Sequence, residues 1–255
     1  MITDNLTNNV YFSDLLPKKC PTLNQHIAEA LEANGVRYAY LSETKDIWCR
    51  DFMPIQIEED RFVSYRYTPD YLQDNTGLRL QTNPIAVLQA SQNRLTHVLQ
   101  NSVTIDLILD GGNVAKCGNT IVMTEKVFFE NKDKTRAEVE RILKDTFQKA
   151  LEKHFDVIPL KYEAKRQHAR SWAYINFLQV GKLVLVPQLG LEEDEQALEQ
   201  IGNALPNCEV IGISALEAVR RGGALNCISW NIKTSNHENT KNKDGETMTA
   251  ATLQR

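Results

Sequence analysis

The stretch IDLILDGGNVAKCGNTIVMTEKVFFENKDKTRAEVERILKDTFQKAL, residues 105–151, contains both kinds of regular structure that this chain is expected to form. Two short apolar runs, at 105–110 and 119–124, have the length and the branched side chains of strands. A helix follows them, opened by a capping box of Thr135 and Glu138, and its apolar residues recur every three or four positions. Strands that alternate with helices predict an α/β protein.

The same alternation continues through the rest of the chain. Capping patterns predict further helices from Thr22, Asn83 and Ser214, and apolar periodicity predicts one more over residues 192–205. Five helices among paired strands suggest five similar modules, although no repeat of individual residues is visible. The other strand candidates are 36–41, 52–57, 61–67, 95–100, 156–161, 172–180, 182–187, 208–213 and 226–232.

Composition and charge bound the class of protein. The chain has 255 residues, with 29 Lys and Arg against 33 Asp and Glu, a formal charge of −4. A weakly acidic chain is not expected to bind nucleic acid. It contains no apolar run of membrane-spanning length and no signal-peptide pattern, so we expect a cytoplasmic protein with no membrane partner. A homo-oligomer remains open.

The chain is expected to form one domain over residues 10–232. Residues 1–9 are polar and are predicted to be a flexible N-terminus. Residues 233–255 have almost no large apolar side chain and are predicted to be a disordered tail, because they bury too little surface to offset the entropy of ordering.

No sequence pattern indicates a cofactor or a metal. The five cysteines and five histidines are scattered, without CxxC or HExxH spacing. The glycine-rich motifs that bind nucleotides are also missing from the sequence. Any chemistry is therefore expected to depend on side chains alone.

Three short motifs are candidates for that chemistry, and each also has a purely structural interpretation. DIWCRD (46–51) is either a solvated turn with an internal ion pair or a rigid carboxylate that binds a cation. DGGN (110–113) is an ordinary turn or a binding position at the end of a strand. In RGGALNCI (221–228), Cys227 is either a small buried side chain or a nucleophile.

Taken together and in this order, the three motifs resemble those of the agmatine deiminase and bacterial-type peptidylarginine deiminase family, over roughly residues 10–232. The resemblance implies a five-bladed α/β propeller, the pentein fold, built from pseudo-fivefold ββαβ-like modules. It implies a hydrolase that converts the guanidino group of agmatine, or of free or peptidyl arginine, to a ureido group and ammonia. With agmatine as substrate, such an enzyme acts in putrescine biosynthesis. Amidino transfer to an amine is a weaker alternative.

The resemblance also assigns roles to residues. Cys227 would be the nucleophile, with Asp110 and His168 as its catalytic partners, and Asp51 and Asp110 would grip the planar guanidinium. The remaining substrate-binding candidates are Asp46, Trp48, Arg50 and Asn113.

The histidine segment, RQHARSWAYINF (166–177), departs from the family pattern. An alignment on His168 puts Arg170 where an aspartate is expected. An alignment on Asn176 puts Arg170 at the histidine and Trp172 at the aspartate. In both cases the acid is lost, with Glu163 as the candidate replacement, and Asn226 stands where the family has histidine before Cys227. The alternative function is therefore a non-catalytic pentein that binds a guanidinium or serves as an interaction module.

Overall fold

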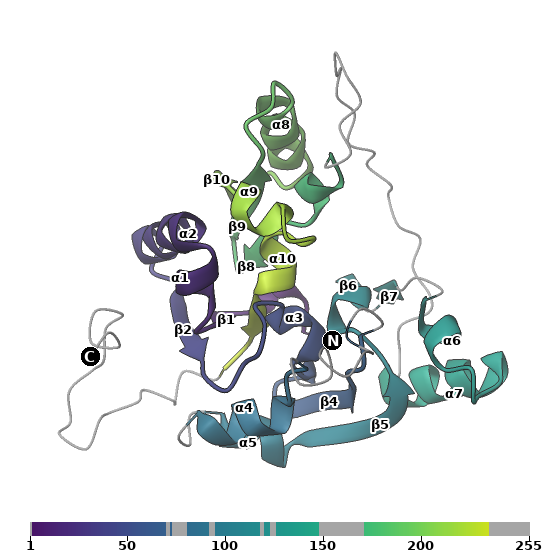
Figure 1. Ribbon diagram of the computed structural model, residues 1–255. Helices are drawn as coiled ribbons and strands as arrows, with labels where there is room; N and C mark the ends of the chain where they lie inside the picture. Colours follow the sequence, from purple (N-terminus) through teal and green to yellow (C-terminus); the bar gives the residue numbers. More distant parts are fainter. Residues whose placement is uncertain are drawn as a thin grey trace. The chain divides into compact units, whose positions relative to one another are not determined.

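The computed structural model describes residues 2–69, 72, 81–91, 95–117, 120–122, 126–147 and 171–234 (Figure 1). The chain divides into two compact units, which are considered separately. The first consists of Met1–Thr3 and Leu41–Asp156, and the second of Asp4–Tyr40 and Val157–Arg255. Both combine helices with small mixed sheets, as the prediction of an α/β protein requires.

The first unit contains a three-stranded sheet and a two-stranded sheet. In the larger sheet the central strand pairs antiparallel with one neighbour and parallel with the other. Its elements, in chain order, are α3 (Cys49–Phe52), β3 (Ile55–Glu58), β4 (Arg61–Arg66), α4 (Pro84–Ala90), α5 (Thr96–Gln100), β5 (Ser102–Ile108), η4 (Gly111–Asn113), β6 (Ala115–Cys117), β7 (Thr120–Val122), α6 (Lys126–Glu130) and α7 (Arg136–Phe147).

The second unit contains two three-stranded sheets. In one of them the central strand pairs antiparallel with one neighbour and parallel with the other, and in the other sheet the first strand of the unit lies in the middle. Its elements are η1 (Asp4–Leu6), β1 (Asn9–Ser13), α1 (Leu16–Lys19), α2 (Pro21–Ala33), β2 (Arg37–Leu41), η5 (Ser171–Ile175), β8 (Leu178–Val180), β9 (Leu183–Gln188), α8 (Asp194–Ala204), β10 (Glu209–Ser214), α9 (Leu216–Val219), α10 (Leu225–Ile228) and β11 (Trp230–Ile232).

One supersecondary pattern recurs in all three larger sheets. In each, the middle strand pairs antiparallel with one neighbour, and it is followed in the chain by helical residues and then by the strand on its other side. The three middle strands are β4, β9 and β1. A short amphipathic helix cannot bury its apolar face alone. In the sheet around β9, Ile201 of α8 packs against Val184 and Val186 of the middle strand. The repeat is thus one of structure, without a repeat of residues.

The sheet around β1 joins distant parts of the chain. β11 pairs with β1 in an antiparallel register in which Asn9 lies opposite Ile232. The side chain of Asn8 extends the contact, because its Oδ1 accepts from Thr234 N and its Nδ2 donates to Thr234 O, both at 2.9 Å. Asn9 Nδ2 donates a further hydrogen bond to Thr234 Oγ1 at 2.6 Å.

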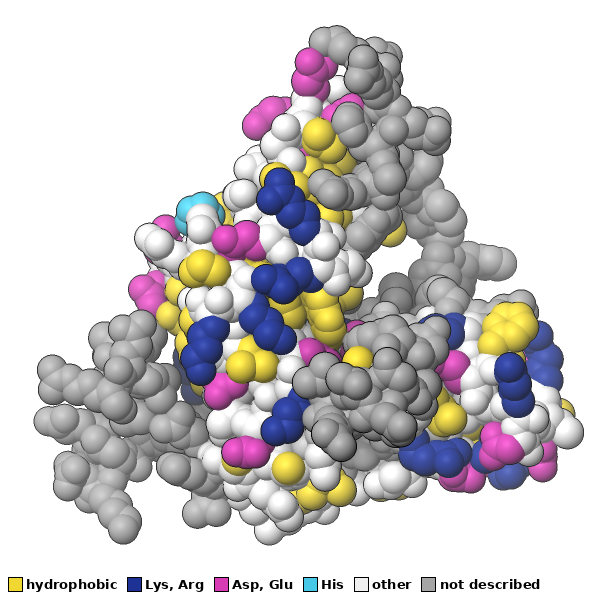
Figure 2. All heavy atoms as spheres, in the orientation of Figure 1, with side chains coloured by type: hydrophobic (Ala, Val, Ile, Leu, Met, Phe, Trp, Pro, Cys, Tyr) yellow, Lys and Arg dark blue, Asp and Glu magenta, His cyan; other side chains and the backbone are white. Residues whose placement is uncertain are grey.

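Two of the predicted helix starts are confirmed in atomic detail. Asn83 Oδ1 accepts from Ile85 N at 3.0 Å at the start of α4. At α7, Thr135 N donates to Glu138 Oε2 at 2.7 Å and Glu138 N donates to Thr135 Oγ1 at 3.3 Å, which is a complete capping box. Along α7 the pairs Arg136–Glu140 and Arg141–Asp145 lie outward, and Figure 2 shows acidic and basic side chains mixed over α6 and α7.

The two other predicted capping boxes are wrong. Helix α2 begins at Pro21 and its N-cap residue is Cys20, because proline takes the first helical position at no cost in hydrogen bonding. The N-cap residue of α9 is Ala215, and no side chain caps it. Both helices nevertheless lie where they are predicted.

Four strand predictions are wrong in whole or in part. In the run predicted at 52–57, Phe52 is the last residue of α3 and the strand begins at Ile55. Residues 96–100 form α5, because Leu95 and Val98, three positions apart, are buried together as on a helix. Residues 172–175 belong to η5, and residues 226–228 to α10, so Cys227 is helical. Short apolar runs fit a strand or one turn of helix equally well.

Two predictions fall outside the described residues, namely the strand at 156–161 and the tail beyond residue 234. Within the described ranges, no helix combines the length and the apolar character that crossing a membrane demands.

Candidate active site

In the first unit, the structure brings the two aspartate motifs together. Helix α3 carries Asp51, and η4 follows Asp110 at the end of β5. Gly112 N donates to Asp51 Oδ1 at 3.1 Å, which joins the two motifs directly. Buried Tyr65 holds the end of α3 in place, since its hydroxyl shares its proton between the carbonyl oxygens of Asp51 and Met53, each 2.9 Å away.

Gly111 and Gly112 stand where the backbone of η4 approaches α3 closely. A Cβ atom on Gly111 would lie 2.2 Å from the carbonyl oxygen of Arg50 and 2.4 Å from the Tyr65 hydroxyl. A Cβ atom on Gly112 would lie 2.3 Å from Asp51 Oδ1. No side chain fits at these distances, so only glycine lets the backbone supply its N–H to the carboxylate.

The other candidates in DIWCRD and DGGN surround this junction. Asp46 Oδ1 accepts from Trp48 N at 2.9 Å, which fixes the turn before α3. Arg50 is buried rather than solvated, and its side-chain stem lies near Gly112. Asn113 closes η4, where its N–H donates to the carbonyl of Asp110 at 2.9 Å.

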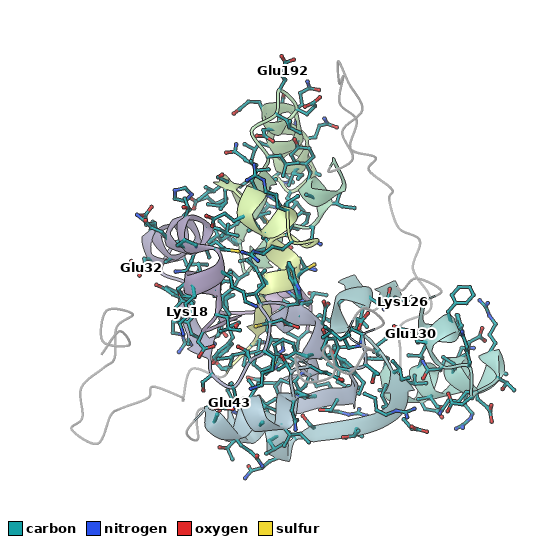
Figure 3. All side chains as sticks on the ribbon, in the orientation of Figure 1. Lys18, Glu32, Glu43, Lys126, Glu130 and Glu192 are labelled. Carbon is teal, nitrogen blue, oxygen red and sulfur yellow. The ribbon has the colours of Figure 1, made fainter. Side chains whose placement is uncertain are left out.

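A lysine that the sequence reasoning missed pairs with Asp110. Lys126 Nζ forms ion pairs with Asp110 Oδ2 and with Glu130 Oε1, and Figure 3 labels both residues of α6. Burial lowers the pKa of Lys126, but its hydrogen bonds to Asp110 and Glu130 outweigh this and raise it above the usual value. Asp110 Oδ1 is buried and accepts no hydrogen bond from the described part of the chain.

The concentration of carboxylates changes the acidity of Asp51. Burial, and then the negative charges of Asp110 and Asp46, raise the pKa of Asp51 to about 7. The Gly112 N–H and the charge of Arg50 act in the opposite direction but are weaker. Asp51 is therefore close to half-protonated at neutral pH.

This shift gives a testable effect on stability. The folded-state pKa of Asp51 lies above the unfolded value of about 4, so its contribution to stability is greatest below pH 4 and falls until about pH 7. The side-chain amide introduced by Asp51→Asn cannot ionise, and its oxygen still accepts a hydrogen bond from Gly112 N. We expect Asp51→Asn to be about 1–3 kcal/mol more stable than the wild type at pH 8.

Urea unfolding at pH 8 and at pH 4 measures this difference. The advantage of Asp51→Asn should shrink toward pH 4, where Asp51 is protonated in the folded state and about half-protonated in the unfolded state. The exposed Asp106→Asn serves as the control and should show no such trend. An advantage of equal size at both pH values would contradict the assigned cause.

In the second unit, α10 presents the candidate nucleophile. Cys227 is partly exposed, and Asn176 Nδ2 donates to its Sγ at 3.2 Å. Asn176 Oδ1 accepts from Cys227 N at 3.3 Å and from Asn226 N at 3.1 Å. No pattern in the sequence indicates the contact between Asn176 and Cys227. Asn176 enters the sequence analysis only as the anchor of one alignment of the histidine segment.

The other described cysteines differ in their surroundings. Cys20 and Cys49 are fully buried, and Cys208 is partly exposed like Cys227. Burial raises the pKa of the Cys20 thiol, although Arg221 opposes this. Cys227 is thus one of two described thiols open to a reagent.

The remaining site predictions lie outside the described residues. These are His168, Arg170, Glu163 and the side chain of Trp172. In the described ranges, His, Cys, Asp and Glu form no group of three or more able to hold a metal ion.

Known proteins resemble this chain in sequence. A family model described as Porphyromonas-type peptidyl-arginine deiminase matches residues 20–151 and 145–232. A protein of Lactococcus lactis assigned as an agmatine deiminase is 42% identical over 57 residues. That match covers 22% of this chain and only 16% of the relative.

Solved structures resemble the chain over far more of its length. The agmatine deiminase of C. jejuni matches 92% of this chain and 96% of its own, with a TM-score of 0.67 and 17% identity. A cysteine-to-serine variant of that enzyme with substrate bound gives a TM-score of 0.66 at 16% identity, with the same coverage of both chains. A dimethylarginine dimethylaminohydrolase covers 89% of this chain and all of its own, with a TM-score of 0.56 and 14% identity.

These likenesses establish the fold, and the family model, which extends over most of the chain, establishes the family. The chain belongs to the Porphyromonas-type peptidyl-arginine deiminase family and has its α/β pentein fold.

Proposed function

We propose that the protein is a deiminase-type hydrolase, which converts the guanidino group of agmatine or of an arginine side chain to a ureido group and ammonia. The observation that carries the proposal is the bond from Gly112 N to Asp51 Oδ1, which holds the two motif carboxylates in one place. A relative of the same fold with substrate bound supports a small guanidine over peptidyl arginine.

The carboxylates suit a guanidinium because it is planar and offers paired N–H donors. Asp110 Oδ1 is an acceptor that no described group uses, and Asp51 lies beside it. Asp46, Trp48, Arg50 and Asn113 would complete the binding group around these two residues. Because Asp51 is half-protonated near pH 7, binding of the cation would displace its proton.

The reaction would proceed in two steps with Cys227 as nucleophile. Its thiolate forms a bond to the central guanidinium carbon, and the C–N bond then breaks as the nitrogen takes up a proton and leaves as ammonia. Water adds to the same carbon of the amidino-thioether, the C–S bond breaks, and the thiolate is restored. In sum, a guanidinium and water give a ureido group and an ammonium ion, without a metal or cofactor.

His168 is the proposed carrier of the protons, with Glu163 as a candidate partner. Arg170 cannot serve near neutral pH, because a guanidinium does not release its proton there. Lys126 cannot replace the histidine either, since its raised pKa keeps it a cation. Its effect on the site is electrostatic, and a bound guanidinium must share Asp110 with it or displace it.

We also infer the finer architecture. The strand–strand–helix–strand pattern of three sheets supports five such modules arranged as a propeller, as one domain over residues 10–232. Flexible segments at 1–9 and 233–255, a cytoplasmic location and a homo-oligomer stay predictions. Within those segments, Asp4–Leu6 form η1, and Asn8 and Asn9 form hydrogen bonds to Thr234.

A second candidate function is a non-catalytic protein that binds a guanidinium. The pairing of Lys126 with Asp110 favours it, because an internal cation already occupies part of the carboxylate. The loss of the aspartate from the histidine segment points in the same direction.

The first test measures ammonia and ureido product from agmatine, free arginine and an arginine peptide. We expect turnover of at least one of them, with the two products in equal amounts. Guanidine binding without product would favour the second candidate. The absence of both guanidine binding and product would exclude the two candidate functions.

A further inference from the structure

The carboxamide of Asn176 holds Cys227 by both its backbone and its sulfur. Its Oδ1 accepts from the N–H groups of Asn226 and Cys227 at 3.1 and 3.3 Å. Its Nδ2 donates to Cys227 Sγ at 3.2 Å. The two backbone donors fix which way the amide faces, because an amide turned over would place its NH₂ group against them. The donor end must therefore face the sulfur.

The position of Asn176 is itself fixed by its surroundings. Asn176 N donates to the carbonyl of Ala173 at 3.0 Å, at the end of η5. Buried Tyr174 anchors that helix, since its hydroxyl donates to Asp194 Oδ1 at 2.7 Å. On the other side, Phe177 packs against the buried cluster of Val184, Val186 and Ile201. Asn176 is thus held between two anchored residues.

We propose that Asn176 is a positioning residue for the nucleophile, which sets the place of Cys227 and donates an N–H to its thiolate. The inference rests on the proposed function, in which Cys227 attacks the guanidinium. A donor aimed at the sulfur stabilises the charged thiolate relative to the thiol, and the thiolate is the reactive form. Asn176 and Cys227 lie in the same compact unit, so this donor does not depend on the histidine–aspartate pair, of which the sequence has lost the aspartate.

Asn176→Asp separates the two halves of this role. Aspartate keeps an acceptor for the two backbone N–H groups, but it replaces the donor facing the sulfur with a negative oxygen. We expect alkylation of Cys227 by neutral iodoacetamide at pH 7 to slow by about tenfold or more, with the midpoint of its pH–rate profile moved to higher pH. With substrate, kcat should fall more than KM changes.

The chain offers a matched control in Gln179→Glu. Gln179 Nε2 donates to Cys208 Sγ at 3.7 Å, so this variant makes the same amide-to-carboxylate change beside a different thiol. It should leave the profile of Cys227 unchanged. Peptide mapping by mass spectrometry assigns the alkylation rate to each cysteine.

A second variant covers the case in which Asn176→Asp does not fold. Asn176→Ala removes the donor without adding a charge, and it should shift the Cys227 profile in the same direction by a smaller amount. An unchanged profile in a folded variant of either kind would overturn the proposal. Because iodoacetamide needs no guanidine site, a wild type without turnover would refute the proposed function and leave this test intact.

Discussion

Cys227→Ala is expected to lower turnover of the best guanidine substrate by about 10⁴-fold or more, because alanine cannot form the covalent intermediate. The ureido product, measured under saturating substrate, gives kcat directly. Binding should persist, since the carboxylates of Asp51 and Asp110 are untouched. A loss of both binding and turnover would point instead to damage to the fold.

Cys208→Ala is the control for this substitution. Cys208 is the other described thiol that is partly exposed, and it also accepts a hydrogen bond from a side-chain amide. Its removal should leave kcat within about twofold of the wild type. If Cys227→Ala retained most of the turnover, Cys227 would not be the nucleophile.

Asp110→Asn is expected to weaken guanidine binding by about 30- to 1,000-fold, which corresponds to about 2–4 kcal/mol. The substitution removes one of two charges from the clamp and replaces a carboxylate oxygen with an N–H donor that faces the substrate's own donors. Lys126 keeps its partner Glu130, so the change does not leave a lysine without a counter-charge. Calorimetric titration at pH 8, where Asp51 is largely ionised, measures the affinity.

Asp106→Asn provides the matched control for Asp110. Asp106 lies four residues earlier, on β5 itself, and also pairs with cations, with Arg66 at 3.1 Å and with Lys134 at 2.9 Å. Its side chain is 71% exposed, whereas that of Asp110 is 18% exposed. Surface ion pairs contribute little, so the affinity should change by less than about twofold. Equal losses in the two variants would exclude a specific clamp at Asp110.

The sequence predicted the features that depend on local chemistry. Thr135 and Glu138 form their capping box because both partners are three residues apart in the chain. The glycine pair after Asp110 marked a close approach of the backbone, and the distances at Gly111 and Gly112 show what it approaches. The strands with continuous branched apolar residues, such as β9 and β10, also lie where they were predicted.

The features that were missed depend on contacts between distant residues. In the sequence, Lys126 cannot be distinguished from a solvated lysine near a helix start, because only the folded chain brings Asp110 beside it. Asn176 lies 51 residues from Cys227 in the chain, and only the packing of η5 brings them together. The runs at 95–100 and 226–228 have no local signal that separates a strand from a helical turn, so tertiary packing decides.

The pairing of β1 with β11 makes the order of synthesis matter. β1 is synthesised about 220 residues before β11, so its partner follows about 10–45 s later at ordinary rates of translation. During that interval one edge of β1 has no strand beside it, and an open edge is a template for pairing with other chains. A nascent chain that stalls before Trp230 would therefore leave that edge of β1 unpaired, and the hydrogen bonds of Asn8 and Asn9 to Thr234 could form only once Thr234 has been made.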